Sequence, residues 1–250
     1  DGGNATAITI DSTENVGVGI APVPSSSSYN GGLLHLHQPS TTTTHGSQIK
    51  LSNGVTGSAA GDGFLISKYG DKNTYLTNFD AGSDIIFNMT NDGGTLAERM
   101  RLNHDGIVTM PSQPAFLATP STTQANIAIN TPVTVVLGTE IFDQGANFAS
   151  NTFTAPVAGR YHFTFNLYTT GWDVSATYYA IYIKTSNRDY ELIKPGAAGG
   201  ATDPSYNGYC LSAFADMDAS DTAYLAITQS GGGAQTDITG SSRFGGFLVC

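Results

Sequence analysis

The sequence is poor in charge, and most of the charge it has is negative. Lys and Arg together number 10 among 250 residues, against 20 Asp and Glu, which gives a net charge of −10. Proteins that hold phosphate backbones or anionic membranes need clustered basic side chains, and so few basic residues, spread thinly, form no such cluster. No apolar run approaches the length of a membrane span. We therefore expect no nucleic-acid partner and no membrane insertion.

Cysteine and helix-forming stretches are scarce as well. The two cysteines, Cys210 and Cys250, are too few for a disulfide framework. Runs of Ala, Leu, Glu, Lys and Arg, from which long helices are built, are nearly absent, and the helix-like window at residues 94–100 is too short to stand alone. Gly is abundant at 30 residues, and aromatic residues reach 10%. This composition indicates an all-β chain.

The most regular pattern is an unbroken alternation that follows Pro156 and Gly159, which break the chain between two strand-like runs. A period of two is typical of a half-buried β-strand. The two faces of this strand would be Tyr161, Phe163, Phe165 and Leu167 on one side, and His162, Thr164, Asn166 and Tyr168 on the other. The pattern favours a β-sandwich that binds other molecules over an enzyme.

The chain divides by composition into residues 1–110 and residues 111–250. The first part is thin in aromatic residues and is punctuated by Asn-Gly and Asp-Gly turn signals. Two of its segments, 10–18 and 102–110, share a pattern of strand, polar turn and strand. Its other strand candidates are residues 32–38, 48–52, 63–67, 73–78 and 84–89.

The second part is richer in aromatic residues, and its strand candidates follow at short intervals, which predicts a sandwich or jelly roll. These candidates are residues 115–118, 133–137, 151–155, 159–168, 177–184, 189–193, 208–215, 222–228 and 243–249.

The first part, in contrast, has few bulky apolar residues for its length, so a single copy would struggle to offset the entropy of ordering its chain. We expect its short amphipathic strands to bury one face against neighbouring copies.

Four ordered segments of the second part resemble one family. They are residues 114–118, 142–165, 211–225 and 242–248, which are similar to its opening strand, its central segment, its penultimate pair of strands and its last strand. The family is the globular head of the q subunit of the first complement component, a jelly roll like that of tumour necrosis factor. The resemblance implies a ten-strand jelly roll that forms a homotrimer about its long axis and acts as a recognition head.

The collagen-like stalk that often precedes such heads does not occur in this sequence. Residues 98–108 and 11–19 are instead similar to shaft segments of bacteriophage tail fibres, and residues 34–100 look like the same kind of module. The two resemblances together imply a trimeric phage fibre, with a β-rich shaft at 1–110 and a jelly-roll head at 111–250. Such a protein belongs to the virion and acts outside the host cell. We expect other virion proteins to hold it through a region upstream of Asp1.

The resembled jelly roll places Cys210 and Cys250 on strands of one sheet that the 161–168 strand separates. Neighbouring strands lie about 4.8 Å apart, so two steps exceed the comfortable reach of a disulfide. Both thiols are therefore expected to be free.

Nothing in the sequence predicts catalysis. Acidic residues lie mostly within two residues of Gly, Ser or Asn, which is typical of turns, as at Asp62, Asp71, Asp92, Asp143 and Asp203. No nucleophile elbow, phosphate-binding loop or zinc motif occurs. We expect no enzymatic activity and no resident cofactor.

His35 and His37 form one candidate metal site, because residues two apart share a face of a strand. In a trimer whose axis faces them, six imidazoles would converge and suit a transition metal, a device that the resemblance to fibre shafts allows. The alternative is two surface histidines beside a buried Leu36. We prefer the alternative, because the sequence holds one such pair and a tight metal site needs further residues to orient its ligands.

Loops of the second part are the expected contact surface, since loops on a rigid scaffold often carry recognition. Aromatic rings beside polar groups suit stacking on sugars and bonding to their hydroxyls. The candidate receptor-binding residues are Trp172, Asp173, Tyr206, Asn207 and Gln235. For Trp172 an alternative is that it fills a protomer interface or the end of the core, and both interpretations fit the sequence.

Calcium is a second candidate ligand of these loops. Some heads of the resembled family bind Ca²⁺ near the apex, so Asp203 and Asp237 are candidate oxygen ligands. Their spacing follows no calcium-binding pattern.

The sequence therefore predicts a non-enzymatic phage fibre whose head attaches to a glycan or an outer-membrane protein of the host. One alternative is a purely structural decoration of the capsid or tail, in which the head only locks the trimer. Another is a secreted lectin-like recognition protein, which the missing stalk and the fibre-like first part disfavour.

Overall fold

The computed structural model describes residues 8–10, 16–18, 34–37, 42–43, 46–196 and 201–250. Within these residues the chain forms strands and turns and no α-helix, which confirms the all-β fold class. It follows that no described segment is a helix with the length and apolar content that crossing a membrane requires. The chain divides into two units, residues 1–109 and residues 110–250.

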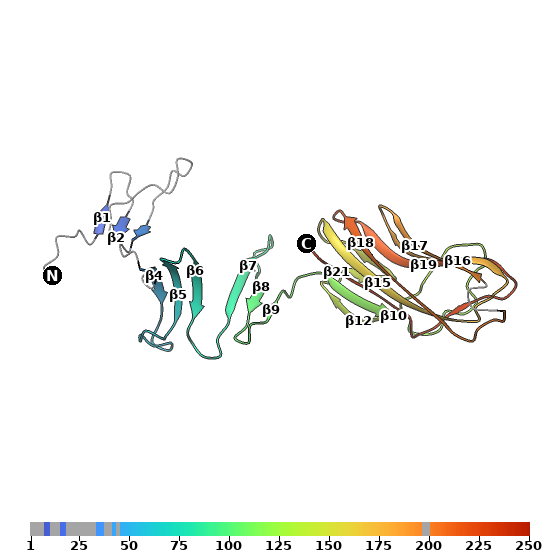
Figure 1. Cartoon of the computed structure of the whole chain (residues 1–250), viewed down its shortest axis with the longest axis horizontal. Helices are drawn as coiled ribbons and strands as arrows, with labels where there is room; N and C mark the ends of the chain where they lie inside the picture. Colours follow the sequence, from blue (N-terminus) through green and yellow to red (C-terminus); the bar gives the residue numbers. More distant parts are fainter. Residues whose placement is uncertain (1–7, 11–15, 19–33, 38–41, 44–45, 197–200) are drawn as a thin grey trace. The chain divides into compact units, whose positions relative to one another are not determined.

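The described strands of the N-terminal unit form three small sheets of three strands each. The middle and last sheets are simple antiparallel meanders, which Figure 1 shows in cyan and green. The strands are β1 (Ile8–Ile10), β2 (Val16–Val18), β3 (Leu34–Leu36), β4 (Gly46–Leu51), β5 (Phe64–Tyr69), β6 (Thr74–Asn78), β7 (Ile85–Thr90), β8 (Leu96–Leu102) and β9 (Val108–Thr109).

The strands of the predicted repeat are present at both ends of this unit, and the turn between them is described in the second copy. Strands β1 and β2 pair antiparallel, and so do β8 and β9, where Leu102 faces Val108. In the second hairpin the chain turns through Gly106 at a φ of 83°, while the Asn103 side chain accepts the amides of Asp105 and Ile107. Most of the helix-like window at 94–100 lies in β8, because it pairs with β7 along its length. Residues 11–15 and 19 of the fibre-like segment lie outside the described part.

The N-terminal unit has almost no core of its own. Among its described residues only Gly63, Leu65 and Ser67 are buried. One row of apolar side chains, Ile49, Ile66 and Leu76, crosses the β4–β5–β6 sheet in register and stays exposed at 42%, 37% and 52%. A second row, Ile85, Leu102 and Val108, crosses the β7–β8–β9 sheet in the same way.

The C-terminal unit is a two-sheet jelly roll. One sheet has the strand order β12-β10-β21-β15-β18 and the other β13-β14-β19-β16-β17, so the described residues supply the ten expected strands, while β20 and β11 add short pairings. The chain crosses between the sheets repeatedly. The strands are β10 (Ala115–Thr119), β11 (Val133–Thr134), β12 (Thr139–Gln144), β13 (Phe148–Ala149), β14 (Thr152–Thr154), β15 (Gly159–Thr170), β16 (Ala176–Thr185), β17 (Asp189–Pro195), β18 (Asn207–Met217), β19 (Thr222–Gly231), β20 (Asp237–Ile238) and β21 (Arg243–Leu248).

The core of this unit confirms the alternation that the sequence shows. Tyr161, Phe163, Phe165 and Leu167 of β15 are at most 1% exposed and belong to one cluster that also takes side chains from the opposite sheet. Phe116 of β10 stacks within this cluster on Phe153 of β14, with ring centroids 5.0 Å apart. Gly246 of β21 is required here, because a Cβ at that position would lie 2.4 Å from the Phe163 ring.

The sheet order also bears on the two cysteines. Strand β15 lies between β18, which holds Cys210, and β21, after which Cys250 follows. The predicted order is therefore confirmed. Both thiols are free and exposed.

Candidate functional site

The structure buries Trp172, the first candidate for receptor contact. Its side chain is 0% exposed, its ring stacks on Tyr179 with centroids 3.6 Å apart, and its Nε1 donates to the carbonyl of Gly196 at 2.9 Å. The premise of an exposed tryptophan is therefore wrong. The loop after β15 folds back, so that the largest side chain of the chain fills the end of the core, as the alternative interpretation holds.

Asp173 is also buried, at 4% exposed, and its carboxylate is fully occupied. Oδ1 accepts from the amide and hydroxyl of Ser175 at 2.8 and 2.6 Å, and Oδ2 accepts from the amides of Gly233 and Ala234 at 2.6 and 2.9 Å. The Ser175 hydroxyl, followed by the Ala234 amide, lowers the pKa of Asp173 to about 2. This carboxylate ties two loops together and has almost no exposed surface to offer a receptor.

The remaining candidates lie at the end of the head where β15 ends, here called the tip, and they differ in exposure. Tyr206 is 77% exposed, so its ring is available to a partner. Gln235 is exposed, but its amide donates to the carbonyls of Asn126 and Ile127 at 3.2 and 3.1 Å. Asn207 is half-buried, and its Nδ2 is buried without a hydrogen-bond partner among the described residues. Receptor contact by these three residues stays a prediction.

The two candidate calcium ligands each hold a backbone amide. Asp203 accepts from Val174 at 2.9 Å, and Asp237 accepts from Asn126 at 2.7 Å. No group of three or more His, Cys, Asp or Glu side chains in the described part has the geometry of a metal site. The structure thus gives each carboxylate a loop-fixing role without bringing the two together with a further ligand.

The histidine pair lies only partly within the described part. His35 belongs to β3, but its side chain lies outside the described residues. His37 is exposed, and Leu36 between them is half-buried, so the buried leucine of the alternative interpretation is only partly matched. Metal binding at this pair stays a prediction.

Several other carboxylates have the turn role that their neighbours in the sequence indicate. Asp62 accepts from the amide of Ala59, and Asp71 accepts from the amide of Asn73. Asp143 accepts from the amides of Asn147 and Phe148 at 3.1 and 2.8 Å. A carboxylate committed to backbone amides in this way is a structural acceptor.

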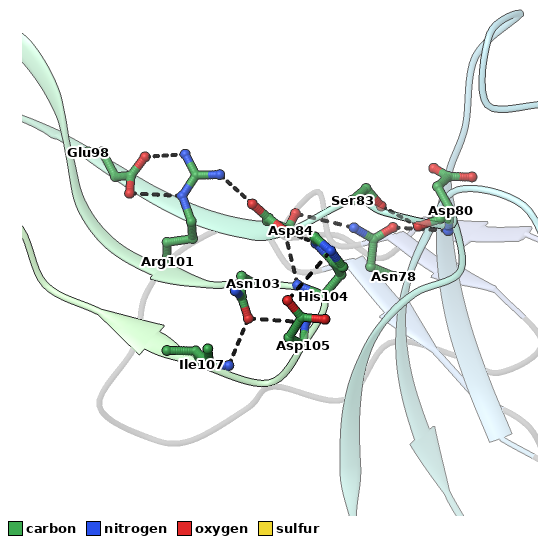
Figure 2. A network of polar contacts seen from close by, with 10 residues as sticks. All are labelled: Asn78, Asp80, Ser83, Asp84, Glu98, Arg101, Asn103, His104, Asp105 and Ile107. Carbon is green, nitrogen blue, oxygen red and sulfur yellow. Dashed lines mark hydrogen bonds and ion pairs between the residues drawn. The ribbon is translucent and has the colours of Figure 1, made fainter.

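A polar network links the strands of the last N-terminal sheet (Figure 2). Arg101 of β8 lies between two carboxylates and forms ion pairs with Glu98 and Asp84. Asp84 also accepts from the amide of His104 at 3.0 Å. Arg101 lowers the pKa of Asp84 and of Glu98, and these carboxylates in turn raise the pKa of Arg101. The network clamps the start of β7 to β8 and to the turn that follows β8.

A cleft of about 460 Å³ lies beside this network. Leu51, Phe64, Ile85 and Ile86 give it apolar walls, while Asp80 and Asp84 lie among its polar lining residues. Asp80 accepts from the amide of Gly63 at 2.9 Å, and Asp84 is held by Arg101. Both carboxylates are thus engaged within the chain.

An exposed aromatic row on the head was missed by the sequence analysis. On the outer face of the β12-β10-β21-β15-β18 sheet, His162 pairs with Phe214 on one side and Phe247 on the other. The ring centroids are 4.9 and 5.4 Å apart, and the two phenylalanines are 66% and 47% exposed. The Nδ1 of His162 is buried without a partner among the described residues. Phe214 lies between the buried Ala213 and Ala215 in the sequence, and a large apolar residue at an outward position is the signal that could have revealed the row.

The sequence matches no described protein family and no curated protein. The structure is similar to the globular domain of zebrafish complement 1qA protein, at 16% identity and a TM-score of 0.42, over 55% of this chain and 98% of that one. It is similar to murine APRIL at pH 8.0, at 11% identity and a TM-score of 0.39, over 55% and 99%. It is also similar to PRD1 vertex protein P5, at 16% identity and a TM-score of 0.40, over 55% and 96%. The jelly-roll assignment of the head rests on its own strand order.

Proposed function

We propose that this chain is a non-enzymatic, homotrimeric virion fibre whose C-terminal head recognises a host cell surface. The observation that carries the proposal is the missing core of the N-terminal unit. Residues 46–109 order into strands, yet Leu65 is the only large apolar side chain that they bury. Ordering costs about 1–2 kcal/mol per residue in backbone entropy, and one buried leucine offsets only a small part of it.

Other copies of the chain supply the missing burial in this proposal. The two apolar rows of the N-terminal sheets lie on surfaces where a neighbouring copy would cover them. The row of Phe214, His162 and Phe247 offers the head a similar surface. We propose three copies, instead of two or four, because segments of the sequence resemble phage fibre shafts and the complement head.

In this proposal the protein is part of the virion, and its head is the element that recognises the host. Tyr206 is exposed at the tip on a rigid jelly roll, where a host glycan or outer-membrane protein would meet it. Three equivalent weak sites on one trimer would raise the overall affinity for a cell surface through avidity.

The occupied tip carboxylates favour a second candidate function. Asp173, Asp203 and Asp237 all hold backbone amides of neighbouring loops, as a purely structural tip would require. In that case the head locks a capsid or tail decoration and touches no receptor.

Two measurements on the full chain test the proposal. Sedimentation equilibrium should give the mass of three chains, and labelled protein should bind host cells and compete with virions for adsorption. A single-chain mass contradicts the fibre. A three-chain mass without cell binding, and without competition, supports the structural decoration instead.

A further inference from the structure

The two faces of the β4–β5–β6 sheet differ in chemistry. One face carries the exposed apolar row centred on Ile66, which we expect other copies to cover. Successive side chains of a strand point to opposite faces, so the neighbouring row of Gln48, Ser67 and Tyr75 lies on the other side. Packing of copies against the apolar row leaves this second side, here called the polar face, open to solvent.

Two tyrosine rings are fixed on the polar face. Tyr69 of β5 and Tyr75 of β6 meet edge to face, with ring centroids 5.4 Å apart and planes inclined by 71°. The Tyr69 ring lies against the backbone of Gly46, where an added Cβ would come within 2.8 Å of its Cδ1. The Tyr69 hydroxyl accepts from Nε2 of Gln48 at 2.9 Å, and the Tyr75 hydroxyl donates to Asp71. Tyr75 is still 39% exposed, so a ring that the protein already holds in place is open to a ligand.

The polar face also holds a buried hydroxyl without a partner. Ser67 lies in register between Gln48 and Tyr75 and is 2% exposed, and its Oγ has no hydrogen-bond partner in the described part of the chain. A hydrogen bond left unmade at a buried hydroxyl is costly. Gln48 is the exposed part of its cover. A ligand hydroxyl that displaces this side chain would give Ser67 a partner, and the Gln48 amide could bond a second hydroxyl of the same ligand.

The charges near the polar face select against an acidic ligand. Asp71 is ionised at neutral pH, because the hydroxyl of Tyr75 lowers the pKa of Asp71. Lys50, a cation on the same face, donates to the carbonyl of Ala59 in the loop that follows β4. The net charge of −10 on the chain repels anions as well. An uncharged ligand therefore fits this face better than a polyanion.

This set of groups matches an uncharged sugar. The apolar face of a pyranose packs on an aromatic ring, while amide and hydroxyl groups bond the sugar hydroxyls. The polar face offers the ring of Tyr75, the amide of Gln48 and the unpaired hydroxyl of Ser67 within one row of the sheet.

We propose that Tyr75, Gln48 and Ser67 bind a neutral hexose unit of a cell-surface polysaccharide. Asp71 and Tyr69 are positioning residues, which hold the ring and the amide. The site goes beyond the proposed function, because it adds a sugar contact on the N-terminal unit to recognition by the head. It rests on that function in one respect, since association of copies has to keep the unit folded.

The test uses the full chain on an array of glucose, galactose and mannose oligosaccharides beside glucuronic and sialic acid oligosaccharides of matched length. The wild-type chain should bind neutral members in preference to acidic ones. Tyr75→Ala should weaken neutral binding about tenfold through lost stacking, whereas Tyr75→Phe keeps the ring and should retain most of the binding. Ser67→Ala should weaken neutral binding about two- to tenfold, the range for one hydrogen bond. The melting temperature of Ser67→Ala should not fall, because the hydroxyl that it removes has no partner in the chain.

Tyr178→Ala is the matched control, since it removes a ring of similar exposure, 38%, from β16 of the head, and it should bind like the wild type. Circular dichroism melts show whether each variant is folded. A wild-type chain without preference for neutral sugars overturns the site, as does full neutral binding by folded Tyr75→Ala or Ser67→Ala. Sedimentation equilibrium separates the two proposals. A three-chain mass without neutral binding removes only the sugar site, whereas a single-chain mass contradicts the fibre.

Discussion

The indole of Trp172 is stacked on the phenol of Tyr179, with ring centroids 3.6 Å apart and planes inclined by 23°. Both side chains are 0% exposed. Tyr179 in turn bonds the amide of Asp173 and the hydroxyl of Thr236, at 2.9 and 2.8 Å. Trp172, for which the sequence allows both receptor contact and a place in the core, is thus the centre of the packing that fixes the tip loops.

The first prediction separates a core role from a contact role for Trp172. Trp172→Ala should lower the unfolding free energy of the head by about 3–5 kcal/mol, since it leaves a large cavity in a packed core. Tyr206→Ala, at a residue 77% exposed, is the control and should change stability by less than about 0.5 kcal/mol. Denaturant unfolding followed by circular dichroism measures both. Unchanged stability of Trp172→Ala would show that the stacked pair is dispensable.

The second prediction concerns the carboxylate of Asp173. Asp173→Asn replaces one acceptor oxygen by an NH₂ group, which faces N–H donors and leaves their hydrogen bonds unmade. The substitution should therefore lower the free energy of unfolding by about 1–3 kcal/mol. The folded-state pKa of about 2 lies below the unfolded value of about 3.9, so this stabilisation is complete above about pH 4. It is lost as the pH falls through about 2.

Unfolding of the wild type and Asp173→Asn at pH 6 and at pH 2 checks both parts of this prediction. The stability gap between them should be large at pH 6 and should narrow at pH 2. Asp218→Asn, at an exposed residue, serves as the control. A gap that is the same at both pH values would contradict the charge-based explanation.

The sequence was most informative where every second side chain enters one core. Strand β15 was predicted from its alternation because Tyr161 to Leu167 face the buried cluster without a break. Strands β13 and β20 have two residues each, too few to show any period. In β12 the alternation is broken by a register shift opposite Leu117 and Ala118, which leaves both Ile141 and Phe142 exposed.

The tip was less predictable for a different reason. A loop of Thr, Gly, Trp and Asp has the same composition whether it projects into solvent or folds back over the core. The decision depends on long-range partners, such as the Gly196 carbonyl that accepts from Trp172 and the Gly233 and Ala234 amides that bind Asp173. These partners are 24 to 61 residues away in sequence, so local patterns hold no information about them.

The third prediction concerns the clamp of Asp84 and Arg101 (Figure 2). Asp84→Asn should speed hydrogen exchange of the β7 and β8 amides in the full chain, because it removes the negative charge of Asp84, which Arg101 and His104 contact. Asp105→Asn is the control, since its more exposed carboxylate lies 3.8 Å from His104 and does not touch Arg101. Lowered pKa values for Asp84 and Glu98 mean that the clamp stabilises above about pH 4 and weakens as the pH falls further. Equal exchange in the two variants would contradict the clamp.

The fourth prediction tests the exposed row of Phe214, His162 and Phe247 on the head. Phe214→Glu places a charge in the middle of a surface that we expect another copy to cover, so exchange of the β15 and β18 amides in the assembled protein should rise. Ile193→Glu, at a residue 56% exposed on the opposite sheet, is the control and should leave exchange unchanged. If both variants exchange like the wild type, the phenylalanine row is not a contact between copies.

The last prediction tests the association of the N-terminal unit, on which the fibre proposal depends. Ile66 lies between Ile49 and Leu76 in the exposed apolar row of the β4–β5–β6 sheet. Ile66→Glu would bury a carboxylate against the apolar row of a neighbouring copy, where no basic residue of the row can pair with it, so three-chain assembly should weaken strongly. Gln48→Glu is the control: it introduces the same charge on the opposite face of β4 and should assemble like the wild type. Sedimentation velocity over a range of protein concentrations measures the assembly of both variants. In residues 46–109 a single copy buries only one large apolar side chain, Leu65. The dissociated Ile66→Glu chain should therefore also lose its strand structure in residues 46–109. A dissociated chain that keeps this structure would mean that the N-terminal unit needs no partner to fold.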